Sequence, residues 1–113
     1  MSGDTTELIE AIEEMLQATR TAREVMQQSE VRIEQYLERL RSGQPASELA
    51  RGSRPAGARS EDNGALEALN RTRQRARAVT FRHLVAEGMS RKEIAELWGF
   101  SQQVVSRSIN YDG

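Results

Sequence analysis

The sequence predicts an all-α protein with a long N-terminal helix of the coiled-coil type, a flexible linker and a small helical C-terminal domain. Ala, Glu, Arg, Gln and Leu dominate the 113-residue chain, and these residue types favour helices. Residues 4–42 contain neither Gly nor Pro, whereas residues 43–64 hold both prolines and four of the eight glycines. Residues 65–113 regain helical periodicity, interrupted by Gly88 and Gly99, where helices can end.

The net charge of −1 conceals an uneven distribution of charged residues. Residues 1–42 carry five Arg against nine acidic residues, residues 43–64 carry three of each sign, and residues 65–113 carry eight basic against five acidic residues. The first segment is therefore acidic and the last is basic. Such a division is typical of an interaction module that carries a nucleic-acid reader.

Composition also excludes several classes of protein. The chain has no cysteine, which excludes disulfides and thiolate metal sites and fits a cytoplasmic protein. We expect no membrane span and no signal peptide, because no apolar run is long enough. His83 is the only histidine and lacks neighbouring metal ligands. With no phosphate-binding glycine loop and no local catalytic signature, we expect neither a cofactor nor enzymatic activity.

Residues 4–42 predict one continuous helix, which Asp4 or Thr5 can cap. Apolar and small residues recur along it with a spacing that alternates between four and three, which is typical of a heptad seam. The residues of this predicted seam are Leu8, Ile12, Met15, Thr19, Ala22, Met26, Ser29, Ile33, Tyr36 and Leu40. Because a lone helix cannot shield such a stripe from water, we expect the seam to mediate self-association.

A homodimer is the favoured assembly, and the direction of its two helices stays open. Thr19, Ala22 and Ser29 weaken the middle of the seam, while Ile9 and Leu16 widen it onto positions that hold ion pairs in a parallel dimer. An antiparallel pair, a higher oligomer or a bundle with a different protein also fits. Packing onto the chain's own C-terminal domain is disfavoured, because that domain is too small to cover so long a helix.

Residues 43–64 predict a flexible linker, because Pro, Gly and Ser are frequent and large apolar residues are few. The stretch RGSRP at 51–55 has the composition of arms that enter the minor groove of DNA. A solvated hinge with scattered charges is the favoured interpretation.

Residues 65–88 predict the first helix of the C-terminal domain, or two helices in succession. Asn63 can cap a helix that begins at Ala65, and Gly88 can end it. Four arginines occupy alternate positions of this helix, and only one of them has an acidic neighbour four residues away. Guanidinium groups without acidic partners bind phosphate well, so we expect phosphate contacts. These arginines are Arg71, Arg73, Arg75 and Arg77.

Residues 90–110 predict two short helices joined by a tight turn. Ser90 caps the first helix, and Glu93 completes a capping box. Gly99 lies where that helix must stop and the backbone must take a positive φ. Ser101 caps the second helix. The expected core of the domain consists of Phe81, Leu84, Val85, Ile94, Leu97, Trp98, Phe100, Val105 and Ile109.

This pattern, with Ile94-Ala95, Trp98-Gly99-Phe100, Val105 and Ile109, resembles the helix-turn-helix of bacterial DNA-binding regulators. The resemblance covers residues 91–110, and it extends to a tri-helical domain without a β wing if the preceding helix is included. It implies that the second helix of the pair enters the major groove. The base contacts it implies are Gln102, Gln103, Ser106, Arg107 and Asn110. The phosphate contacts it implies are Ser101, Arg91 and Lys92, together with the four arginines at 71–77.

An ordinary helical hairpin is the alternative interpretation of residues 90–110. It is disfavoured, because the small Ala95, the turn glycine Gly99 and a polar outer face occur together.

These expectations combine into a sequence-specific double-stranded DNA-binding protein, a bacterial transcriptional regulator acting as a dimer or higher oligomer. Residues 4–42 would assemble it, residues 43–64 would tether it with tolerance of variable half-site spacing, and residues 65–113 would read DNA. The alternative is an adaptor or architectural protein whose long helix binds another protein and whose basic domain contacts DNA with little sequence preference. Both place the protein at the nucleoid in the cytoplasm and imply no membrane contact and no small-molecule ligand.

Overall fold

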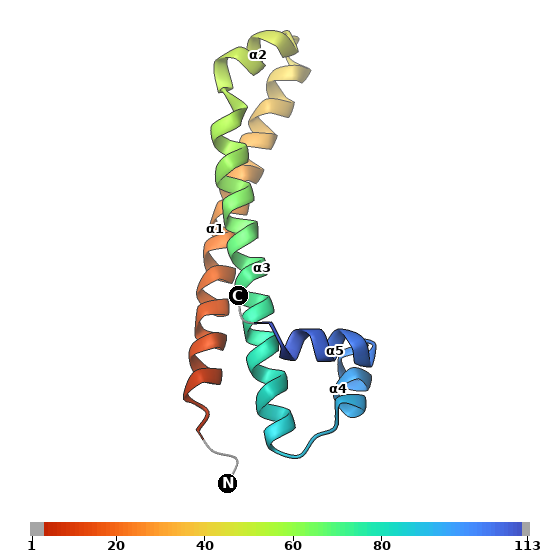
Figure 1. Cartoon of the computed structure of the whole chain (residues 1–113). Coiled ribbons are helices and arrows are strands. Elements are labelled where there is room, and N and C mark those ends of the chain that lie inside the picture. Colours follow the sequence, from red (N-terminus) through yellow and green to blue (C-terminus); the bar gives the residue numbers. More distant parts are fainter. Residues whose placement is uncertain (1–3, 112–113) are drawn as a thin grey trace. The chain divides into compact units, whose positions relative to one another are not determined.

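The computed structural model describes residues 4–111, and its regular structure in that range consists of helices alone (Figure 1). In chain order they are α1 (Thr6–Arg41), α2 (Ala46–Ser53), α3 (Pro55–Ala86), α4 (Arg91–Trp98) and α5 (Gln102–Ile109). No strand occurs among the described residues, so the all-α prediction is confirmed for them. None of these helices has an apolar stretch long enough to cross a membrane.

Two compact units share the long helices α1 and α3. One unit combines the chain up to Gln17 with the chain from Leu69 onward, and the other spans Ala18–Ala68. Each unit therefore contains a segment of α1 and a segment of α3. This division differs from the predicted domains 4–42 and 65–113.

The prediction of a flexible linker at 43–64 is wrong, because most of this segment is helical. Pro45 is the N-cap of α2, and Pro55 is the first residue of α3. Proline is accepted at the start of a helix, where its missing N–H would have no intrahelical acceptor. Leu49 is buried and anchors α2. Both prolines therefore mark the beginnings of helices and not an irregular tether.

The predicted helix start at Ala65 with Asn63 as its cap is also wrong, since both residues lie inside α3. Gly57 and Gly64 lie inside this helix too. An interior glycine costs roughly 1 kcal/mol relative to alanine, which neighbouring Ala, Arg and Glu residues and helix packing offset. The chain turns before α3 at Arg54, whose φ of 47° is the only positive non-glycine φ among the described residues.

In the first unit, α1 packs against α3 through small side chains. Ala11 is 1% exposed and lies in one cluster with Ala76 and Val79, flanked by Leu8 and Met15. Side chains this small allow two helix axes to approach closely. Helix α1 therefore has a partner within its own chain, and the premise that nothing there could cover it is wrong.

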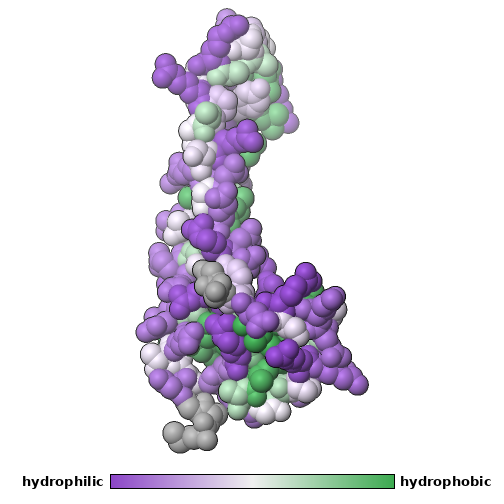
Figure 2. All heavy atoms as spheres, viewed as in Figure 1, coloured by the Kyte–Doolittle hydropathy of each residue, from purple (hydrophilic) through white to green (hydrophobic). Residues whose placement is uncertain are grey.

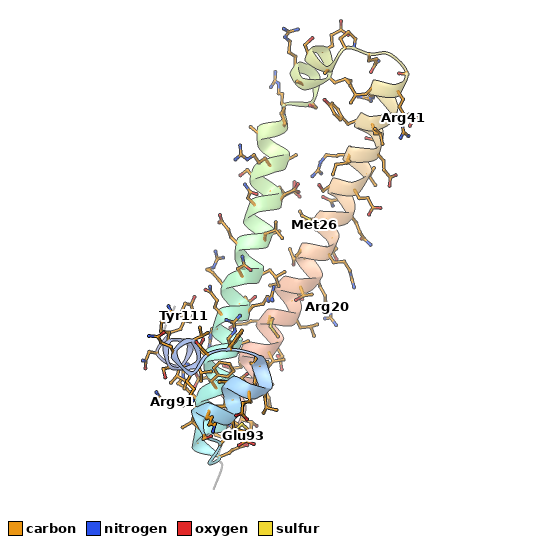
Figure 3. All side chains as sticks on the ribbon, turned by 90° about the vertical axis from the view of Figure 1, so that its right-hand side faces the viewer. Arg20, Met26, Arg41, Arg91, Glu93 and Tyr111 are labelled. Atoms are coloured by element: carbon orange, nitrogen blue, oxygen red, sulfur yellow. The ribbon has the colours of Figure 1, made fainter. Side chains whose placement is uncertain are left out.

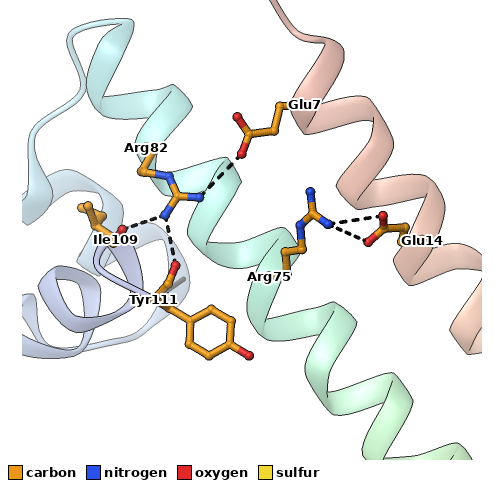
Figure 4. Close-up of polar contacts among 6 residues, drawn as sticks. All are labelled: Glu7, Glu14, Arg75, Arg82, Ile109 and Tyr111. Atoms are coloured by element: carbon orange, nitrogen blue, oxygen red, sulfur yellow. Dashed lines mark hydrogen bonds and ion pairs between the residues drawn. The ribbon is translucent and has the colours of Figure 1, made fainter. Parts of the chain in front are cut away.

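Ion pairs border this contact and show that the two helix segments are antiparallel (Figure 4). Arg75 Nη1 lies 3.1 Å from Oε2 of Glu14, and Arg82 Nη2 lies 3.8 Å from Oε1 of Glu7. Arg82, the arginine nearer the end of α3, pairs with Glu7, the acidic residue nearer the start of α1. The two helix segments therefore run in opposite directions.

In the second unit, the contact between α1 and α3 is partly polar. Asp62 Oδ1 lies 3.1 Å from Nη2 of Arg32, and Asp62 Oδ2 accepts a hydrogen bond of 3.1 Å from Oγ of Ser29. The Asp62 side chain is 24% exposed, so its charge is partly withdrawn from water and is satisfied by both partners. Ala22 is buried in the same unit.

The predicted seam of α1 differs from the face that loses exposure. The positions turned from solvent follow the same alternation of three and four, but they run through the alanines. They are Leu8, Ala11, Met15, Ala18, Ala22, Val25, Ser29 and Arg32, and none of them is exposed. From the predicted seam, Ile12, Thr19, Ile33 and Tyr36 stay exposed, while Met26 and Leu40 are half-buried.

The core of the C-terminal helices contains Phe81, Ile94, Ala95 and Val105, all buried. Leu84, Met89, Phe100 and Ile109 pack against this cluster. The prediction of Val85, Leu97 and Trp98 as core residues is wrong, because they are 39%, 64% and 42% exposed. Trp98 still contacts the core edge-on, with its ring centroid 5.0 Å from that of Phe81.

Candidate nucleic-acid interface

Local hydrogen bonds fix both ends of α4. Ser90 has an extended backbone, and its Oγ accepts a 3.1 Å hydrogen bond from the backbone N–H of Glu93. Arg91 and Glu93 lie in the first turn of this helix (Figure 3). At the other end Gly99 takes φ 72°, a left-handed conformation that is strained for residues with a side chain. The predicted cap and turn are therefore confirmed.

Helix α5 follows directly and is held by the core on one side. Ser101 is its N-cap, and the Ser101 Oγ accepts a hydrogen bond of 3.2 Å from the backbone N–H of Val104. Val105 is fully buried and Ile109 is half-buried against the cluster around Phe81. One stripe of α5 is thus inaccessible, and the opposite stripe is available for a ligand.

Three of the predicted base-contacting residues, Gln103, Arg107 and Asn110, lie on the opposite stripe, whereas Gln102 lies on the side of Val105 at the start of the helix. Gln102, Gln103, Arg107 and Asn110 are exposed. Ser106 is half-buried, and its Oγ accepts a hydrogen bond of 3.0 Å from Nη1 of Arg91. Four of the five predicted residues are therefore accessible to a ligand, and the fifth is hydrogen-bonded within the domain. The surface in the region of α4 and α5 is largely hydrophilic (Figure 2).

The predicted phosphate contacts fall into two groups. Arg71, Arg73 and Lys92 are exposed, as is Ser101 at the start of α5. Among the others, Arg75 is paired with Glu14, and Arg77 lies 5.1 Å above the ring of Phe100.

The pairing of Arg75 contradicts the reasoning that the arginine cluster lacks acidic partners. The partner is 61 residues away in sequence, so helical spacing could not reveal it. Arg91 is similarly committed to Ser106.

Arg82 is a positioning residue that the sequence did not indicate. Its Nη1 donates to the backbone carbonyl oxygens of Ile109 at 2.8 Å and of Tyr111 at 3.2 Å (Figure 4). Carbonyls at the end of a helix lack intrahelical donors, so a guanidinium group there satisfies them and suits the helix dipole. Arg82 thus ties the C-terminal end of α5 to α3.

A shallow cavity of about 240 Å³ lies between α3 and α5. Its lining residues are Gln74, Arg77, Val104, Arg107, Ser108 and Tyr111. Two guanidinium groups therefore border the same hollow beside the exposed stripe of α5. The two guanidinium groups suit the phosphates of a nucleic-acid backbone.

Among the described residues, no group of His, Asp and Glu could hold a metal ion. His83 lies 2.7 Å from Oε2 of Glu87 and is half-buried.

Comparison of the chain with protein-family models, with curated proteins and with solved structures gives no match. The resemblance to bacterial helix-turn-helix regulators therefore depends on residues 91–110 and on the local geometry described above.

Proposed function

We propose that the protein binds double-stranded DNA in a sequence-specific manner and acts as a transcriptional regulator of the bacterial type. The observation that carries the proposal is the placement of α5. Val105 anchors one side of this helix, while Gln103, Arg107 and Asn110 are exposed on the other. Gln forms paired hydrogen bonds with adenine and Arg with guanine, so this stripe has the chemistry of a major-groove reader.

Phosphate contacts would fix the position of α5 on the duplex. The first turn of α5 offers backbone N–H groups and the exposed Ser101 hydroxyl, which suit a phosphate oxygen. Arg71, Arg73 and Lys92 are exposed and have no ion-pair partner among the described residues. The excess of basic residues in 65–113 supports the same role.

A single helix-turn-helix makes few contacts, so we propose that the protein works as a dimer or higher oligomer. Joining two readers raises the effective concentration of the second to roughly the millimolar range. The predicted tolerance of variable half-site spacing loses its basis, because the segment expected to be a flexible tether is helical.

An adaptor or architectural role is the second candidate. It is favoured by large apolar side chains that α1 leaves exposed, such as Ile9, Leu16 and Ile33. Such side chains fit a protein partner, and the basic C-terminal helices would then contact DNA with little sequence preference.

Selection from a random duplex library tests the proposal. The full chain should enrich a defined motif, and Arg107→Ala should lower affinity for that motif by roughly 5- to 150-fold and relax one base position. Gln103→Ala should change preference at a different position. Gln28→Ala, an exposed glutamine on α1, is the matched control and should change nothing.

The outcome separates the two candidates. An architectural protein would bind all duplexes alike, and Arg107→Ala would weaken every one by the same factor. Enrichment of no motif by the wild-type chain would contradict sequence-specific reading.

A further inference from the structure

Helix α1 has a second apolar stripe beside the face that contacts α3. Its positions also alternate between three and four residues, so they share one side of this single helix. These positions are Ile9, Ile12, Leu16, Thr19, Arg23, Met26, Glu30, Ile33, Leu37 and Leu40, which we term the outer face of α1. Ile33, Ile9 and Leu16 are 62%, 51% and 47% exposed. Isolated exposed apolar residues are ordinary, but seven apolar residues among the ten positions of one helix face mark an interface.

The arrangement of residues on the outer face is nearly symmetrical about its middle. Apolar side chains occupy both ends, and Met26 lies at the centre. The only charged residues are Arg23 and Glu30, which lie on opposite sides of Met26. Both are exposed, and neither makes an ion pair with another described residue.

We infer that a second copy of this chain covers the outer face, with the two α1 helices antiparallel and related by a twofold axis near Met26. A twofold contact requires a surface that is complementary to itself. In this arrangement Ile12 lies opposite Leu40 of the second copy, and Leu16 lies opposite Leu37. Each apolar end of one helix therefore covers the other apolar end of its partner.

The charged pair selects the antiparallel direction. Arg23 lies about 4.5 Å along the helix from Met26 in one direction, and Glu30 lies about 6 Å away in the other. Reversing the second helix brings Arg23 of one copy within about one turn of Glu30 of the other, twice per dimer. A parallel dimer would instead place Arg23 beside Arg23 and Glu30 beside Glu30, and like charges at an interface are unfavourable.

This inference extends the self-association part of the proposed function and is independent of DNA reading. Molar mass in solution and motif enrichment from a duplex library are separate measurements. A dimer that selects no motif would leave the interface standing and contradict the proposed function. A monomer that selects a motif would do the reverse.

Charge exchange tests the interface by equilibrium sedimentation. Arg23→Glu and Glu30→Arg should each weaken the dimer by about tenfold or more, because each creates two like-charge contacts. The double exchange should restore the wild-type dissociation constant to within about threefold. Arg20→Glu and Glu34→Arg are matched controls on exposed positions outside the outer face and should leave dimerisation unchanged.

Cross-linking tests the direction of the helices, because the chain contains no cysteine and each introduced thiol is unique. An equimolar mixture of Leu16→Cys and Leu37→Cys should form a disulfide-linked heterodimer, whereas each variant alone should stay largely uncross-linked. Both side chains are exposed, so the substitutions leave the fold intact, as unchanged helical circular dichroism should show. Cross-linking of each variant with itself would show a parallel dimer and overturn the inference. So would a wild-type chain that stays monomeric at about 100 µM, a concentration at which specific interfaces assemble.

Discussion

Helix α3 contacts its neighbours in two chemically different ways. Towards α4 and α5 it uses large side chains, and Phe81, Ile94 and Val105 are completely buried there. Towards α1 it uses Ala76 and Val79 against Ala11, with ion pairs at the border. A core of large apolar groups contributes more free energy per residue than a contact between alanines. Large buried side chains therefore hold α5 in place, whereas α1 is held by small side chains that let it lie close to α3.

This difference also explains why α1 keeps apolar residues on its surface. A contact through alanines uses little of the apolar area that a 36-residue helix offers. Its larger residues, such as Ile33 and Leu37, therefore remain on other sides of the helix.

Truncation of the large core residue should have the greatest effect on stability. Phe81→Ala removes a fully buried ring that contacts Trp98 and Phe100, and it should lower the free energy of unfolding by about 3–5 kcal/mol. Chemical denaturation followed by circular dichroism measures this loss. The control is Leu97→Ala, a residue 64% exposed, which should change stability by less than about 1 kcal/mol. Equal losses for both variants would show that α4 does not sit on Phe81.

Enlargement of the small contact should have the next largest effect. Ala11→Leu inserts three carbon atoms where α1 and α3 approach, and it should lower the free energy of unfolding by about 1–3 kcal/mol. The same denaturation series measures it. Glu10→Leu adds a comparable side chain at an exposed neighbouring position and should be nearly neutral. A neutral Ala11→Leu would contradict the close approach of the two helices.

Gly99 and Gly64 should respond in opposite ways to substitution by alanine, because only Gly99 has a positive φ. Gly99→Ala forces alanine into a left-handed conformation and should destabilise the protein by about 1–2 kcal/mol, although the added Cβ meets no atom within 4 Å. Gly64→Ala, inside α3 and equally unobstructed, should stabilise it by about 0.5–1 kcal/mol. Thermal unfolding midpoints provide the comparison. Loss of stability in Gly64→Ala would contradict a continuous helix α3 at this position.

The smallest effect should come from Asp4 at the start of α1. Hydrogen bonds from the Thr6 hydroxyl and then from the Thr6 backbone N–H lower the pKa of the Asp4 carboxyl from its usual 3.8. A lowered pKa in the folded state means that the contribution is present above pH 3.8 and is lost as the pH falls through the folded value. Asp4→Ala should therefore lower the unfolding midpoint slightly at pH 6 and leave it unchanged at pH 2. Asp4→Asn, which can still accept the hydrogen bonds, should remove this pH dependence.

Local chemistry made part of the fold predictable from sequence. Ser90, Gly99 and Ser101 act through backbone groups within a few residues, so their roles as caps and turn could be inferred without any tertiary contact. The same holds for Asp4, whose carboxylate accepts from Thr6. The exposed residues of α5 followed once Val105 was placed in the core.

The remaining features depend on residues that are distant in sequence. Arg82 binds the carbonyls of Ile109 and Tyr111, and Arg75 binds Glu14, so no local pattern indicates either contact. On α1 two heptad series overlap, and the choice between Ala11 and Ile12 depends on how closely α3 approaches. Pro45 and Pro55 suggested a linker, because proline occurs both in irregular segments and at the first positions of helices. The proline alone does not distinguish these two cases.

The second half of α3 contains a stretch that is buried on every side. Ala76, Ala78, Val79 and Phe81 are all buried, and at about 100° per residue they point in directions distributed around the whole helix. Random mutagenesis of the gene should therefore recover almost no folded variants altered at these codons, whereas the solvent side of α1 should accept many. A library built to alter DNA preference would best leave residues 76–81 untouched and diversify α5 alone.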